Sequence, residues 1–244
     1  MARALAIVTA LVCAACDGGT ASDPPRLYLW IWQRSENLAF ADPAENSVAL
    51  WVATFHFGAD GSGVQIRRNP TILPGDIEVI AVFRLEIDPG HEESSLDLLA
   101  IEIPSFAEPL GVDEVQIDFD ALVSQRDFYR RLIEALRERM PGKRVSITAL
   151  ASWCFGDPWI EGLPIDAAVP MYYRMGPDGE RIREHLSSGR QIPATICRDN
   201  AGYSLDEPGM GPVAAKRVFV FSPEGWNEER YRATRAWLEA AAAD

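Results

Sequence analysis

The chain has 244 residues, a net charge of −13 and 48% hydrophobic residues. That length suits one α/β barrel or two small domains, and the hydrophobic fraction is ample for a packed core. The acidic balance argues against nucleic acid and anionic lipid headgroups as partners. The three histidines are not paired at metal-ligand spacing, which argues against a zinc site, and no sequence motif calls for a cofactor.

The first fifteen residues are typical of a secretory signal peptide, with one arginine before an apolar run at 5–12 that is too short to cross a bilayer. Ala14 and Ala15 precede Cys16, and this arrangement resembles the lipobox of bacterial lipoproteins. Cys13 stands where a lipobox usually has leucine. The resemblance implies that Cys16 is acylated and becomes the new N-terminus. The alternative is ordinary cleavage near Ala15, which gives a soluble exported protein.

Residues 16–25 are rich in Gly, Ser, Asp and Pro, which predicts a flexible tether. We therefore expect a signal peptide at 1–15, a lipid-anchored tether at 16–25 and a single barrel domain at 26–244. The expected location is the bacterial cell envelope, with membrane contact only through the anchor. Without the leader, which holds one arginine and no acid, the net charge is 22 − 36 = −14. Cys154 and Cys197 either pair in an oxidising compartment or stay as buried thiols, and their spacing leaves both open.

Apolar and β-branched runs predict strands at 27–32, 47–57, 64–68, 76–87, 112–121, 144–152, 166–173 and 217–221, with a weaker strand between 192 and 204. Turn residues at 58–63 separate two of these runs and predict a hairpin. Helices are expected at 128–140, 179–188 and 227–242. The first follows a capping signal at 124–127 and ends at Pro141-Gly142.

From residue 112 onward, strands and helices follow one another along the chain, and most strands are near-continuous apolar runs. Such runs are typical of parallel strands buried on both faces. The pattern predicts an α/β fold, a (β/α)8 TIM-like barrel with some short or missing helices and a β-hairpin insertion near the N-terminus. An open doubly wound sheet is the alternative, although no glycine-rich fingerprint supports it as a dinucleotide binder.

The strand at 115–120 carries the most informative polar residues. Side chains alternate along a strand, so Gln116, Asp118 and Asp120 share one face. In a barrel that polar face points inward, which places Asp120 at the C-terminal mouth and Asp118 one layer below. Two carboxylates this close raise the pKa of one of them, which creates a proton donor near neutral pH.

Five segments together resemble an uncharacterised family of exported bacterial proteins, the domain of unknown function 3142: IDFDALVSQRDFY, SITALASWC, AVPMYYRMG, SLDEP and VFVFSP. This resemblance implies location and fold rather than a reaction. More distantly, the same strand is similar to the fourth barrel strand of chitinase-type glycosidases, where inward acids alternate and end in the catalytic glutamate. Asp120 occupies that last position here, one methylene shorter, and Gln116 replaces an acid. Those enzymes also use the substrate's own acetamido group.

Other residues near strand ends complete the predicted site. Glu207, next to Asp206, is the candidate for a second catalytic carboxylate, with surface solvation as the equal alternative. Aromatic faces suit sugar stacking, although each tryptophan singly is better explained by core packing. Tyr173 and Arg174 end one strand and face opposite ways, so at most one points inward. The predicted substrate-binding residues are Gln116, Trp32, Trp153, Tyr173, Arg174 and Trp226.

A structural role competes with the catalytic one, because strand-end aspartates often pair with arginine, here Arg126 or Arg174. Arg84 and Glu86 share one face of their strand and are expected to form an ion pair. The leading hypothesis is a saccharide-binding barrel in which Asp120 is the general acid and Asp118 tunes it. The rivals are a non-catalytic barrel that binds glycan or protein, and another hydrolase chemistry on the same fold. We expect a monomer, no cofactor, and a saccharide or other envelope ligand.

Overall fold

The computed structural model describes residues 24–207 and 210–242. The predicted signal peptide, Cys16 and most of the predicted tether lie outside these residues. Within the described ranges, no helix is both long and apolar enough to cross a membrane.

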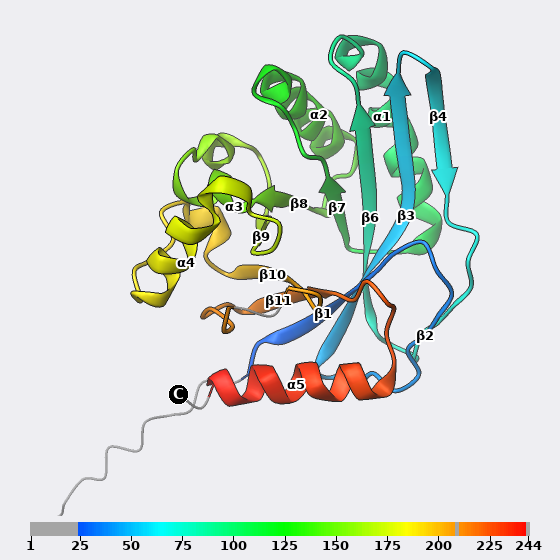
Figure 1. Cartoon of the computed structure of the whole chain (residues 1–244). Coiled ribbons are helices and arrows are strands. Elements are labelled where there is room, and N and C mark those ends of the chain that lie inside the picture. Colours follow the sequence, from blue (N-terminus) through cyan, green and yellow to red (C-terminus); the bar gives the residue numbers. More distant parts are fainter. Residues whose placement is uncertain (1–23, 208–209, 243–244) are drawn as a thin grey trace, which may run out of the picture.

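Eight parallel strands close into a barrel (Figure 1). They are β1 (Arg26–Ile31), β3 (Asn46–Gly58), β6 (Glu78–Ile87), β7 (Glu114–Asp118), β8 (Arg144–Leu150), β9 (Ala167–Met171), β10 (Asn200–Ser204) and β11 (Arg217–Phe221). Each strand pairs with the next along the chain, and β1 pairs with both β3 and β11. The predicted (β/α)8 barrel is confirmed, and closure through β1 excludes the open doubly wound sheet.

The helices are α1 (Glu92–Ala107), α2 (Arg126–Arg139), α3 (Ala151–Phe155), α4 (Gly179–Ser187) and α5 (Glu228–Ala242). Short 3-10 turns lie at Glu108–Leu110, Val123–Gln125, Trp159–Gly162, Gly176–Asp178 and Thr195–Cys197. In the described part of the chain no α-helix follows β1, β3 or β10, in line with the expected missing helices. The sequence did not predict α1, because Leu98 and Ile101 are exposed while Leu99 and Ile103 are buried, so its apolar residues mark no single face.

The predicted hairpin is present, since β3 runs past the barrel and pairs antiparallel with β4 (Gly61–Ile66). A second small sheet joins β2 (Glu36–Asn37) to β5 (Thr71–Ile72). Both lie in the connections after β1 and β3, where a regular barrel would have helices.

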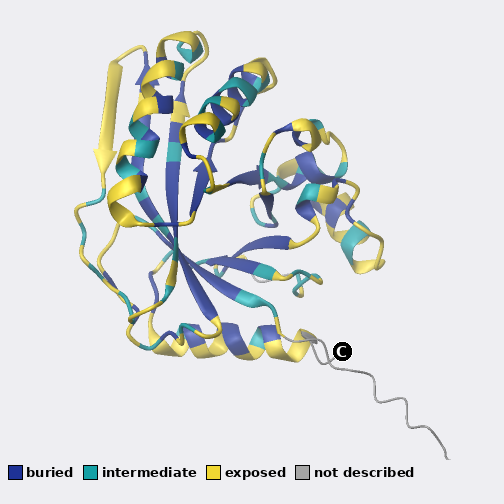
Figure 2. Ribbon diagram, turned by 180° about the vertical axis from the view of Figure 1, so that it is seen from behind, coloured by how far each residue is buried: buried dark blue, intermediate teal, exposed yellow. Residues whose placement is uncertain are grey.

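The core lies between the strands and the surrounding helices, and Figure 2 shows buried strands behind helices whose outer faces are exposed. On α2, Phe128, Leu132 and Leu136 are buried against the barrel. A disulfide between Cys154 and Cys197, with Cα atoms 6.1 Å apart, joins α3 to the turn before β10. Of the two states that the cysteine spacing left open, the structure has the paired one.

Candidate active site

The end of β7 sends alternate side chains to opposite sides. The ring of Phe119 packs against α2, with its centroid 6.0 Å from that of Phe128 and 5.2 Å from that of Tyr129. Gln116 and Asp118 are buried on the inward side. Because β7 ends at Asp118, Asp120 extends past the strand into the mouth of the barrel.

A cavity of about 460 Å³ opens at this mouth. Its walls come from the carboxyl ends of β1, β6, β7, β8, β9 and β11, where barrel enzymes carry their chemistry. The lining residues are Trp30, Trp32, Val82, Arg84, Asp118, Asp120, Thr148, Leu150, Met171, Tyr173, Arg174 and Phe221. Aromatic and aliphatic walls thus surround a small polar centre, which is the usual composition of a small-molecule site.

Asp118 is held by two neighbouring strands. The Nη1 atom of Arg84 donates to Asp118 Oδ2 at 2.9 Å, and Thr148 Oγ1 donates to Oδ1 at 2.7 Å. Arg84 also donates through Nε to Glu86 Oε1 at 3.1 Å, which confirms the expected ion pair. Both oxygens of Asp118 are therefore engaged, and the carboxylate is fixed in place beside a cation.

Asp120 is the carboxyl group that faces the cavity. Solvent reaches it through the mouth, yet the cavity walls partly desolvate it. This burial raises the pKa of Asp120, the negative charge of Asp118 raises it further, and Arg84 acts in the opposite direction. Burial is the larger cause, whereas the alternation of the two aspartates predicted their mutual repulsion as the cause.

Trp30 and Gln116 form the floor of the site. The indole Nε1 of Trp30 donates to Gln116 Oε1 at 2.9 Å, and Gln116 is completely buried. Gln116 does not line the cavity, so it supports Trp30 from below. Below Trp30, Phe219 lies with its ring centroid 5.2 Å away.

Tyr173 and Arg174 both line the cavity, so the expectation that at most one of them points inward is wrong. That expectation assumed a continuing strand, but β9 ends at Met171. Arg174 has a φ of +51°, in the left-handed region, which breaks the alternation of side chains. Burial raises the pKa of the Tyr173 hydroxyl, and the charges of Asp118 and Asp120 raise it further. The hydroxyl is therefore neutral at physiological pH.

Glu207 does not line the cavity and instead binds Arg174. The backbone N–H of Arg174 donates to Glu207 Oε2 at 2.9 Å, and its guanidinium lies 4.0 Å from Oε1 and 3.8 Å from Asp206. Glu207 borders a separate groove with Tyr203 and Trp237. The structure therefore does not bring Glu207 opposite Asp120.

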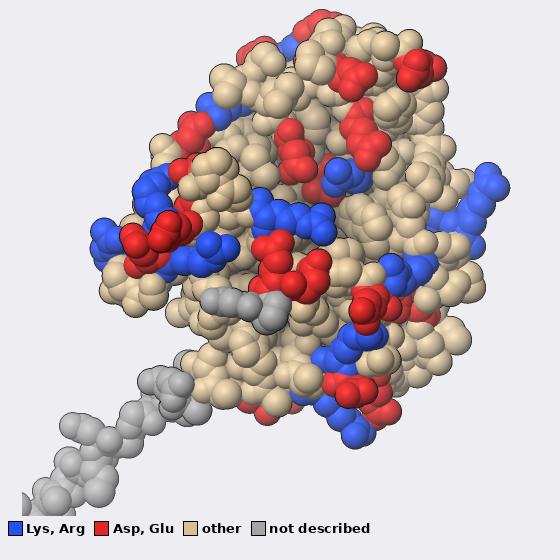
Figure 3. Space-filling view, viewed as in Figure 1, with Lys and Arg blue, Asp and Glu red and all other residues tan. Residues whose placement is uncertain are grey.

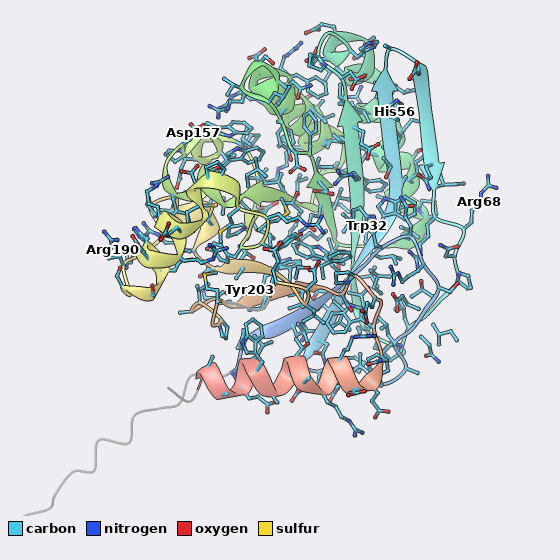
Figure 4. All side chains as sticks on the ribbon, in the orientation of Figure 1. Trp32, His56, Arg68, Asp157, Arg190 and Tyr203 are labelled. Carbon is cyan, nitrogen blue, oxygen red and sulfur yellow. A yellow bond between two sulfur atoms is a disulfide. The ribbon has the colours of Figure 1, made fainter. Side chains whose placement is uncertain are left out.

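Of the three predicted tryptophans, Trp32 lines the cavity, and Figure 4 labels it near the centre of the view. Trp153 is buried in the core, its ring centroid 5.0 Å from that of Trp159. Trp226 is also buried, and its indole N–H donates to the backbone oxygen of Trp30 at 3.3 Å. Both stabilise the walls rather than face a ligand.

The alternative arginine partners are engaged elsewhere. Arg126 pairs with Asp157, and its guanidinium lies 5.1 Å from the ring centroid of Trp159. Arg174 faces Asp206 and Glu207. Neither pairs with Asp120, so of the two aspartates at the end of β7 only Asp118 pairs with an arginine of the described chain, and that arginine is Arg84.

Several lining residues were not predicted from the sequence as part of the site, among them Trp30, Arg84, Thr148 and Phe221. Alternation would have found most of them. Trp30 lies two residues before Trp32, and Thr148 lies two residues before Leu150 on β8. The inward parity that was applied to β7 predicts these residues when it is applied to every strand.

Charge around the mouth is mixed. Figure 3 shows acidic and basic side chains interspersed across the middle of the face turned to the viewer, without a large patch of one sign. Among the residues that the structure describes, no group of three His, Cys, Asp or Glu side chains could hold a metal ion.

The fold is a closed (β/α)8 barrel with a cavity at its mouth, and comparison with solved structures agrees on the fold. A fungal endo-β-N-acetylglucosaminidase of glycosyl hydrolase family 18 superposes with a TM-score of 0.56 at 14% identity, over 89% of this chain and 97% of the fungal one. At this identity the likeness shows the fold alone. No family model matches the chain, and no curated protein matches it significantly. The resemblance to the domain of unknown function 3142 stays a prediction.

Proposed function

We propose that the cavity binds a saccharide and that Asp120 acts as the general acid in its hydrolysis. The observation that carries this proposal is the carboxyl group of Asp120, which has a raised pKa and no ion-pair partner among the described residues, in a cavity walled by Trp30, Trp32 and Tyr173. A carboxyl group that holds its proton closer to neutral pH is suited to protonate a glycosidic oxygen. Aromatic rings give apolar faces on which sugar rings pack.

Asp118 is proposed to position and polarise rather than to attack. A retaining glycosidase of the two-carboxylate type needs a free nucleophile facing its acid, but both oxygens of Asp118 accept hydrogen bonds. A substrate whose own 2-acetamido oxygen attacks the anomeric carbon needs no enzyme nucleophile. Asp120 would give its proton to the leaving oxygen and later take one from the incoming water. We therefore propose a 2-acetamido sugar, which is the kind of sugar named for the fungal neighbour.

The test is a panel of oligosaccharides, with and without 2-acetamido groups, incubated with the full chain and three variants. Asp120→Asn should keep binding and lose turnover by about a hundredfold or more, whereas Asp120→Glu, the longer acid, should retain activity. Asp113→Asn is the control, because Asp113 is exposed before the opposite end of β7. Failure of the wild type to bind any member would contradict the proposal.

A non-catalytic glycan-binding barrel is the second candidate. The observation in its favour is that no second free carboxylate faces Asp120 among the described residues that line the cavity. In that case wild type and Asp120→Asn bind the same glycans and neither releases a product. Measurement of binding by calorimetry and of products by mass spectrometry on the same samples separates the two candidates.

We also propose that the protein is exported and lipid-anchored through Cys16. The disulfide between Cys154 and Cys197 supports an oxidising compartment, where such bonds persist. Expression in bacteria supplied with a labelled fatty acid tests the anchor. Cys16→Ala should abolish labelling and Cys13→Ala should leave it intact, while labelling that survives Cys16→Ala would contradict the anchor.

A further inference from the structure

The hairpin strand β4 has one paired and one unpaired edge. All six residues, Gly61–Ile66, are exposed, and among the described residues β4 pairs only with β3. Figures 1 and 2 both show β4 at the outer margin of the molecule. Natural edge strands are usually blunted by proline, by lysine or by a bulge, because a free edge recruits other strands. The segment Gly-Ser-Gly-Val-Gln-Ile has neither residue, and its pairing with β3 runs without a bulge.

The backbone shows which residues of β4 offer their bonds outward. The N–H of Arg67 donates to Val52 O on β3 at 2.8 Å, so Arg67 turns toward β3. Bonding direction alternates along an antiparallel strand, and Gly63 and Gln65 therefore also turn toward β3. Ser62, Val64 and Ile66 consequently direct their N–H and C=O groups to the open edge.

We propose that this edge binds β4 of a second copy of the chain, in an antiparallel pairing with a two-fold axis at Val64. In that register Val64 lies opposite its own copy, and Ser62 lies opposite Ile66. Each of these facing pairs has both residues turned outward, so each exchanges both of its hydrogen bonds. A shift by one residue would set outward-facing residues against inward-facing ones and lose the bonds.

Charge selects a second copy as the partner. Residues that face each other in this register have numbers that add up to 128. Asp60 lies in the turn just before β4 and Arg68 just past its end, so the register brings Asp60 of one copy near Arg68 of the other at both ends of the pairing. Asp60 and Arg68 are both exposed, neither forms an ion pair with another described residue, and Arg68 projects away from the barrel in Figure 4. Opposite charges that meet across two paired strands stabilise the pairing. The chain thus carries its own complement, which an unrelated peptide would have to supply.

The neighbouring helix extends the same surface. The ring of Phe55 contacts Phe106 of α1, and Val64 is paired with Phe55, so Val64 faces the α1 side of the hairpin. In Figures 1 and 2 α1 lies beside β4. Ile101 on α1 is 55% exposed. Joining the two hairpins would set both copies of α1 on one side of the continuous sheet, where such apolar residues become covered.

The experiment measures the molar mass of the full chain in mild detergent by sedimentation over a concentration series. The expected result is a reversible dimer. Asp60→Arg and Arg68→Asp should each weaken dimerisation by about tenfold, because each places like charges opposite at both ends. The double variant Asp60→Arg/Arg68→Asp should restore the wild-type constant. Asp113→Arg, an exposed aspartate far from β4, is the matched control and should change nothing.

Val64→Pro gives a second, independent variant. Its N–H is turned outward, so its loss should leave the bonds of β4 to β3 in place and abolish the dimer. Circular dichroism checks that the barrel still folds. A wild type that stays monomeric at about 100 μM, or a dimer that is indifferent to Asp60→Arg and Val64→Pro, overturns the proposal. Saccharide binding does not enter any of these readouts, so this proposal fails or succeeds separately from the proposed function.

Discussion

The two ends of β7 place acidic side chains in opposite environments. At the start of the strand, Glu114 is buried, accepts a hydrogen bond from Arg217 at 2.8 Å and lies 3.4 Å from Arg144. Arg217 in turn lies over Tyr28, 4.7 Å from its ring centroid. Beyond the last residue of the same strand, Asp120 opens into the cavity without an ion-pair partner among the described residues.

Asp118 shows how to interpret this contrast. Its pairing with Arg84 resembles that of Glu114 with Arg217, which is the arrangement of a structural salt bridge. A buried carboxylate on a barrel strand therefore does not by itself mark a catalytic group. The difference lies at Asp120, which follows the paired carboxylates Glu114 and Asp118 along the chain and faces the cavity.

The largest expected loss of stability is at the start of β7, where Glu114 is buried. Arg217→Met would leave the Glu114 carboxylate buried with only the more distant Arg144, at a cost of about 3 kcal/mol in the free energy of unfolding. Urea unfolding measures the loss. The double variant Arg217→Met/Glu114→Leu should recover most of it, because the buried charge is then absent. A loss below about 1 kcal/mol would show that Arg144 compensates.

The next largest loss of stability is expected at the floor of the cavity, where Trp30 binds Gln116. Trp30→Phe removes the only hydrogen-bond donor to Gln116 Oε1 among the described residues, and this oxygen lies fully buried. An unsatisfied buried acceptor costs about 2 kcal/mol of stability. Trp32→Phe is the matched control, because Trp32 is only partly buried, and it should cost clearly less. Equal losses for the two variants would mean that ring packing rather than the hydrogen bond holds the floor.

Much of this contrast could be predicted from the sequence, because strand geometry is local. Apolar runs gave the eight barrel strands, and the alternation along 115–120 gave the inward face of β7. The helix α1 was missed because its apolar residues lie all around it. Tyr173 and Arg174 were both predicted at the site, but not that both would line the cavity, because the strand ends at Met171 and Arg174 has a left-handed backbone that strand alternation does not describe.

The ion-pair partners could be predicted only in part. Arg84 and Glu86 were found because they are two residues apart on one strand. The bond from Arg84 to Asp118 joins neighbouring strands whose register the sequence does not reveal. Trp153 and Trp226 follow strand ends without lying in a strand, so alternation could not separate them from Trp32, although only Trp32 of the three lines the cavity.

A smaller effect concerns how Asp118 changes the pKa of Asp120. The charge of Asp118 raises the pKa of Asp120, and therefore Asp118→Asn should lower that pKa. A carboxyl-carbon NMR titration of Asp120 measures the shift directly. The cost in stability should be about 1 kcal/mol, because Arg84 keeps Glu86 as a partner.

Glu86→Gln is the control for this titration, since Glu86 is not among the charges that act on Asp120. It should leave the pKa of Asp120 in place. An unchanged pKa in Asp118→Asn would mean that desolvation alone sets the protonation of Asp120. Asp118 would then be a structural residue, like Glu114.

The smallest expected effect is the change in stability caused by Asp120→Asn, and its sign is the most informative. Because the pKa of Asp120 is raised above its ordinary value of 3.8, ionisation of this group favours the unfolded chain. Its contribution to stability is complete below the unfolded pKa and is lost as pH rises through the folded pKa. Asp120→Asn should therefore be more stable than wild type at about pH 7 and lose this advantage at about pH 3, with a difference under about 1 kcal/mol because solvent reaches the group.

Urea unfolding of both proteins at the two pH values checks the sign. Asp157→Asn, which loses the ion pair with Arg126, should move the other way and be slightly destabilised at neutral pH. If Asp120→Asn were also destabilised there, Asp120 would be contributing to the fold as Glu114 does. A carboxyl group that the fold would be more stable without is better explained by what it does to a ligand in the cavity.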